Sequence, residues 1–153
     1  MSTDTALIKL YSGRMLALAA DIPHAARLEA PDATAKQRSP LCGSVVTVDV
    51  RVEGDVLTGL GQDVKACALG QAAAAVVGAN APGATLSQLA TAREQLFNML
   101  KGSDLRPEAP FSDFEVLLPA VGFENRHASI LLSIDGVIAA MRTAMSLPEV
   151  REL

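Results

Sequence analysis

Three side chains that could bind a metal ion or react through sulfur stand far apart in the sequence: Cys42, Cys67 and His127. Thiolate and imidazole groups are preferred ligands of zinc and iron, and thiolates hold iron–sulfur clusters. A cysteine beside a histidine can instead act as a nucleophile beside its base. Either chemistry requires three distant segments to meet, so the elements around each residue decide whether a site can form.

A β-hairpin is predicted between the two cysteines. Residues 45–52, VVTVDVRV, alternate valine with other residues, which is typical of a strand with one apolar and one mostly polar face. A turn follows, and VLTGLGQDVKA returns as a second strand. If Gly54 and Asp55 form a two-residue turn, Glu53 pairs with Val56.

The same register carries Cys42 and Cys67 to facing positions at the open end of the hairpin. Gly59 and Gly61 could add a bulge that shifts the pairing by one residue, which would still leave the thiols neighbours. From Cys67 the pattern changes to a helix that runs to Gly78. A thiol at a helix N-terminus is expected to have a lowered pKa, which favours the thiolate that binds metal.

Two capping boxes are predicted further along the chain. Thr85 with Gln88 opens a helix that extends to about Leu100, and Ser112 with Glu115 caps a short helical turn. Near the N-terminus, residues 5–20 are expected to form another helix. The intervening Pro-rich stretch reads as a loop that can contain a short edge strand.

The last helix is expected to span about residues 125–146. Its apolar positions recur at steps of three and four residues, which places them on one face: Leu131, Ile134, Ile138, Met141 and Met145. His127 lies one turn before Leu131, on the same face of the helix. The histidine is therefore predicted to point inward from the first turn of the helix.

The bulk composition restricts the class of function. A chain of 153 residues suits one domain, which we place over residues 1–153. A net charge of −4 and 3% aromatic residues argue against nucleic-acid binding, which uses basic and stacking side chains. No run approaches the ~20 apolar residues of a membrane span, and MLALAA is too short for a convincing signal peptide. We expect a cytoplasmic protein with reduced cysteines.

The motifs resemble those of the NifU/IscU/SufU iron–sulfur cluster scaffolds. The matching stretches are LCGSVVTVDV, VKACALGQAAAAVVG and NRHASILLSIDGV, within a resemblance that covers about Leu10 to Met141 and includes IPHAARLEAP. It implies an α+β fold, with a small antiparallel sheet of three strands covered on one face by helices. It also implies that Cys42, Cys67 and His127 are ligands of iron, zinc or a [2Fe–2S] cluster.

Two family positions differ in this chain. Ser44 stands where the family has an aspartate, which leaves a weak hydroxyl as a possible fourth ligand, and Ala128 replaces the third family cysteine. A zinc or iron ion, or a cluster, would thus be one strong ligand short within a single chain. A cluster shared between two copies, and hence a homodimer, is one arrangement that would complete the set.

The resemblance implies a function and its partners. Such scaffolds receive sulfur from a cysteine desulfurase and pass the cluster to apo iron–sulfur proteins, without being enzymes themselves. One alternative is a degenerate member that serves as a metal-binding or protein-interaction module and no longer assembles clusters. Another is a thiol enzyme with Cys67 as nucleophile and His127 as base, although no orienting carboxylate or oxyanion-hole motif accompanies them.

Overall fold

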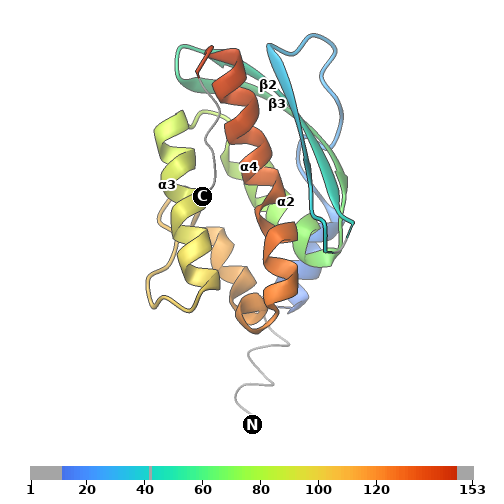
Figure 1. Ribbon diagram of the computed structural model, residues 1–153, viewed down its shortest axis with the longest axis vertical. Helices are drawn as coiled ribbons and strands as arrows, with labels where there is room; N and C mark the ends of the chain where they lie inside the picture. The colour runs from blue at the N-terminus through green and yellow to red at the C-terminus, as the bar shows by residue number, and fades with distance from the viewer. Residues whose placement is uncertain (1–11, 42, 148–153) are drawn as a thin grey trace.

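The computed structural model describes residues 12–41 and 43–147, so Cys42 lies outside the described residues. Three antiparallel strands, β1 (Ala33–Arg38), β2 (Val45–Glu53) and β3 (Val56–Lys65), form a sheet in the order β1-β2-β3. Helices pack on one face of this sheet (Figure 1). The predicted α+β class and the three strands are confirmed.

The hairpin has the predicted turn and the predicted bulge. Glu53 pairs with Val56, and Gly54 has a φ of +62°, a left-handed conformation that glycine adopts without strain. The register then shifts between Arg51 and Val52, so that Arg51 faces Gly59. Beyond the shift every partner is displaced by one residue.

The apolar face of β2 forms the centre of the core. Val46, Val48 and Val50 are at most 1% exposed, and Leu57 and Leu60 of β3 join them. The covering helices are α2 (Ala68–Asn80), α3 (Leu86–Leu100) and α4 (His127–Ala144), with 3-10 segments η1 (Ser112–Gly122) and η2 (Glu124–Arg126) before α4. Residues 12–20 are also helical. No helix among the described residues is both long and apolar enough for a membrane span.

Helix α4 lies between the sheet and α3, with α2 beside it on the sheet (Figure 1). Its predicted stripe is confirmed at Leu131, Ile134 and Met141, which are buried. Burial extends well beyond this stripe because α4 has neighbours on several sides. At Gly136 the helix lies so close to β2 that an added Cβ would come within 2.7 Å of Val48 Cγ2. Small residues therefore set how deeply α4 sits on the sheet.

One predicted capping box is confirmed and the other is wrong. Thr85 accepts from the backbone N–H of Gln88, and the Gln88 side chain accepts from the N–H of Thr85. Ser112 caps nothing, because η1 begins after Phe111 without a side-chain cap. Phe111 and Phe114 are fully buried with their rings stacked, so core packing and not a local cap positions this turn.

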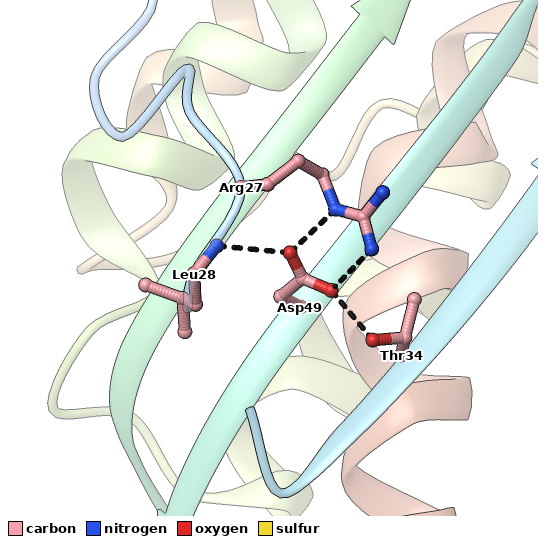
Figure 2. Close-up of polar contacts among 4 residues, drawn as sticks. All are labelled: Arg27, Leu28, Thr34 and Asp49. Atoms are coloured by element: carbon pink, nitrogen blue, oxygen red, sulfur yellow. Dashed lines mark hydrogen bonds and ion pairs between the residues drawn. The ribbon is translucent and has the colours of Figure 1, made fainter. Parts of the chain in front are cut away.

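The other face of the sheet is covered by the segment that precedes β1. The Asp49 carboxylate is fully buried there and accepts from Arg27, the Leu28 backbone N–H and Thr34 (Figure 2). The Arg27 hydrogen bond is the main cause that holds the pKa of Asp49 below its usual range. Opposite Asp49, an added Cβ at Gly61 would lie 2.4 Å from the Ala26 carbonyl oxygen. The buried carboxylate of Asp49 and the missing side chain of Gly61 together allow the segment before β1 to lie directly against the sheet.

Candidate metal centre

Cys67 occupies the junction between the end of β3 and the start of α2. It is the N-cap residue of α2, with φ −67° and ψ 172°, and its side chain makes no capping hydrogen bond. Its carbonyl accepts the first helical bond, from the Gln71 N–H. The thiol is partly exposed and lies where the partial positive charge of the helix N-terminus favours an anion. The predicted helix boundary is confirmed.

Two hydroxyl groups accompany this thiol. Ser129 Oγ of α4 lies 3.5 Å from Cys67 Sγ, and it donates a hydrogen bond of 3.0 Å to Ser44 Oγ. Ser129 is 1% exposed and Ser44 is 4% exposed. The end of the hairpin, the start of α2 and the first turn of α4 thus meet at one small polar cluster, which we call the Cys67–Ser129–Ser44 cluster.

A glycine in α2 allows α4 to lie this close to the thiol. A Cβ added at Gly70 would lie 2.6 Å from Ser129 Oγ and 2.8 Å from the Ala66 Cβ. Real Cβ atoms do not approach other atoms so closely, so an alanine here would force α2 and α4 apart or rotate Ser129. The absence of a side chain at Gly70 is therefore what brings Ser129 to the thiol.

His127 points inward, as predicted, and is 7% exposed. Its Nε2 lies 2.9 Å from the carbonyl oxygen of Ala120 in η1. A carbonyl only accepts, so Nε2 carries a hydrogen, and whenever the ring is neutral Nδ1 holds the lone pair. Nδ1 is buried and has no hydrogen-bond partner among the described residues. A histidine with one nitrogen fixed by a carbonyl and the other left as a free lone pair has the form of a metal ligand.

Ala128 lies on another side of the same turn. Together with His127 it lines a groove of about 860 Å³ between α3 and α4, to which Phe97, Leu131 and Arg142 also contribute. The position of the third family cysteine is thus partly exposed and opens onto this groove. Ser129, the next residue, faces the thiol.

Of the predicted ligands, the structure describes Cys67, His127 and the weak fourth one, Ser44. Cys67 and Ser44 meet at the cluster, whereas the His127 ring bonds to the Ala120 carbonyl oxygen. Over residues 12–41 and 43–147, no group of three or more His, Cys, Asp or Glu side chains is placed to hold a metal. Since Cys42 is outside these residues, the complete set of Cys42, Cys67 and His127 stays a prediction.

Sequence reasoning missed Ser129. The pattern nevertheless contains a signal: Ser129 and Ser133 are one turn apart on α4, and both are 1% exposed. Ser133 donates to Gln62 Oε1 of β3, and the Gln62 amide donates to the Ala74 carbonyl oxygen of α2. Polar residues one helical turn apart in an otherwise apolar helix predict buried hydrogen bonds to its neighbours.

Comparison with solved structures places this arrangement among known proteins. The N-terminal part of a nitrogen-fixing NifU-like protein from Brucella abortus is 39% identical, with a TM-score of 0.83 over 87% of this chain and 92% of that one. Two further structures are each 18% identical. One is a hypothetical protein, with a TM-score of 0.78 over 88% of this chain and 98% of that one. The other is described as a candidate iron–sulfur cluster assembly scaffold for the SUF system of Fervidobacterium islandicum, with a TM-score of 0.73 over 83% and 93%.

These similarities show the fold class of the protein and the family to which it belongs. At 18% identity, the second and third structures establish a shared fold. The first is similar enough in sequence, over most of both chains, to show that this protein belongs to the NifU-like family. The resemblance seen in the sequence motifs is thereby confirmed. No protein-family profile matches the chain, and no curated protein matches it either.

Proposed function

We propose that this protein is an iron–sulfur cluster scaffold that binds iron or a [2Fe–2S] cluster through Cys42, Cys67 and His127, and passes it to apo-proteins. The observation that carries the proposal is His127 Nδ1, a buried ring nitrogen without a hydrogen-bond partner among the described residues. Leaving a buried polar atom unsatisfied costs about 1–3 kcal/mol, so such an atom calls for a functional explanation. A metal ligand role supplies one.

The surroundings of Cys67 support the same role. A thiolate is the form that binds iron and zinc, and a helix N-terminus favours the anion. Ser44 lies in the same cluster but is a weak fourth ligand, because a neutral hydroxyl binds these metals poorly. The remaining coordination positions would be filled by a small thiol, by solvent or by a second copy of the chain. Zinc is a further metal that this ligand set accommodates.

The partners that we propose follow from membership of the family. A cysteine desulfurase would supply the sulfur, and apo iron–sulfur proteins would receive the cluster. The protein itself would act as a carrier and not as an enzyme. Its compartment would be the reducing cytoplasm, since metal binding requires thiols that are not oxidised.

A second candidate is a family member that binds metal or a protein partner without building clusters. Two observations favour it: Ser44 and Ala128 replace ligands of the family, and Ser44 is already engaged as a hydrogen-bond acceptor in a buried cluster. The two candidates differ in one measurable property. A scaffold forms a [2Fe–2S] cluster when supplied with iron and sulfide, whereas a metal-binding module takes up an ion only.

The test begins with protein purified without oxygen. Iron, zinc and acid-labile sulfide per chain are measured together with the visible spectrum, before and after reconstitution with iron and sulfide. We expect Cys67→Ser to abolish binding and His127→Ala to weaken it. His24→Ala is the matched control, because His24 is the only other histidine of the chain. Equal metal content in the parent protein and in Cys67→Ser would refute the proposal.

A further inference from the structure

We propose that Ser129 is a positioning residue of this metal site, whose hydroxyl donates a hydrogen bond to the Cys67 thiolate when metal is bound. The inference rests on the proposed function and deepens it. The observation behind it is the contact of 3.5 Å between Ser129 Oγ and Cys67 Sγ, made by a hydroxyl that is 1% exposed. Water therefore does not compete for this group.

The hydrogen positions of the cluster show how Ser129 would respond to metal. A serine hydroxyl has one hydrogen, and Ser129 gives its hydrogen to Ser44 Oγ at 3.0 Å. With its hydrogen there, Ser129 Oγ can accept an S–H from the protonated Cys67 thiol, which lies 3.5 Å away. Metal binding removes this hydrogen from sulfur.

The thiolate that remains is only an acceptor. Ser129 can meet it by turning its O–H from Ser44 to the sulfur, since a hydroxyl rotates freely about its C–O bond. The contact between Ser129 and the sulfur thus stays a hydrogen bond in both states, with the direction of donation reversed.

A hydrogen bond of this kind changes the metal site measurably. Hydrogen bonds to ligating sulfur tune its electron density, and loss of an outer-shell partner commonly weakens metal binding by 10–100-fold. The close contact at Gly70 fixes Ser129 in place for this role. Ser129 would thus orient Cys67 and lower the energy of its sulfur lone pair without binding the metal itself.

Cobalt(II) serves as the probe, because its thiolate complexes have a sulfur-to-metal charge-transfer band. The parent protein, Ser129→Ala and Ser133→Ala are compared for cobalt affinity and for the wavelength of that band. We expect Ser129→Ala to bind about tenfold more weakly and its band to move to longer wavelength. Ser133→Ala is the matched control: it removes an equally buried hydroxyl one turn along α4, whose partner is Gln62. Its affinity and band should equal those of the parent.

Ser44→Ala gives a second, independent measurement. It removes the acceptor of Ser129 and a weak ligand but leaves the Ser129 hydroxyl beside the thiol, so its loss of affinity should be smaller than that of Ser129→Ala and its band should move less. An unchanged band and affinity in Ser129→Ala would overturn the inference while leaving the proposed function intact. Equal losses in Ser44→Ala and Ser129→Ala would also overturn it, since the effect would then belong to their mutual bond. A parent protein without any cobalt–thiolate band would refute the proposed function and this inference with it.

Discussion

Gly70 of α2 lies directly against Ser129 of α4, at a distance that leaves no room for a Cβ: an added one would be 2.6 Å from Ser129 Oγ and 3.2 Å from the Ser129 carbonyl oxygen. The second atom belongs to the backbone of α4 and cannot move alone. The separation of the two helices next to Cys67 therefore depends on a missing side chain.

Gly70→Ala should lower the free energy of unfolding by about 1–2 kcal/mol. Overpacking of a filled site costs about 1–3 kcal/mol, and the higher helix propensity of alanine offsets up to about 1 kcal/mol of this. Thermal and denaturant unfolding measure the change. Gly13→Ala is the control, since a Cβ there meets nothing within 4 Å and Gly13 is helical. A Gly70→Ala protein as stable as the Gly13→Ala protein would contradict the packing argument.

Asp49→Asn should destabilise the protein by about 1–3 kcal/mol near pH 7, because it removes the charge that holds Arg27, Leu28 and Thr34 in a buried network. Because the pKa of Asp49 is lowered by folding, its charge contributes stability above the ordinary pKa of about 3.9, and this contribution is lost as the pH falls. The difference between Asp49→Asn and the parent should therefore shrink between about pH 5 and pH 3.

Melting temperatures across this pH range measure the effect. Glu53→Gln serves as the control, since it neutralises an exposed carboxylate on the same strand. A difference between Asp49→Asn and the parent that stays constant down to pH 3 would show that the charge of Asp49 is not what stabilises the covering segment.

Ala128→Cys should strengthen metal binding, because it restores a thiolate next to His127 on the first turn of α4. We expect cobalt affinity to rise by about tenfold, which corresponds to about 1.4 kcal/mol, and the iron held after reconstitution to increase. Ala139→Cys is the control, since Ala139 lines the same groove three turns further along α4. Similar gains in both variants would mean that any added thiol in the groove binds metal, and that position 128 has no special role.

Thr85→Ala should cost about 1 kcal/mol of stability, because the Gln88 N–H loses its acceptor and the capping box is broken. Ser112→Ala is the natural comparison, since the sequence offers the same Ser/Thr-x-x-Glu/Gln pattern there while the structure shows no side-chain cap. It should change the melting temperature little. A larger loss in Ser112→Ala than in Thr85→Ala would mean that the assignment of these two caps is reversed.

The sequence by itself determined those features that depend on local pattern. Alternating valines and the Gly54 turn determined the hairpin, and Gly59 indicated the bulge. The change of period after Lys65 located the start of α2, so the placing of Cys67 at a helix N-terminus was predictable. The three motifs also sufficed to indicate the family, which the solved structures then confirmed.

Only the tertiary structure decided which groups meet. A helical period can place His127 on an inward face, but it cannot say that the ring bonds to Ala120 or that Nδ1 has no hydrogen-bond partner within residues 12–41 and 43–147. Nor could it show that Ser129, and not its neighbour Ala128, lies against Cys67. Adjacent residues of a helix point about 100° apart, so a small rotation of α4 about its axis selects which of them faces the thiol. That rotation is set by contacts such as Gly136 on Val48, between segments far apart in the chain, and no local pattern encodes it.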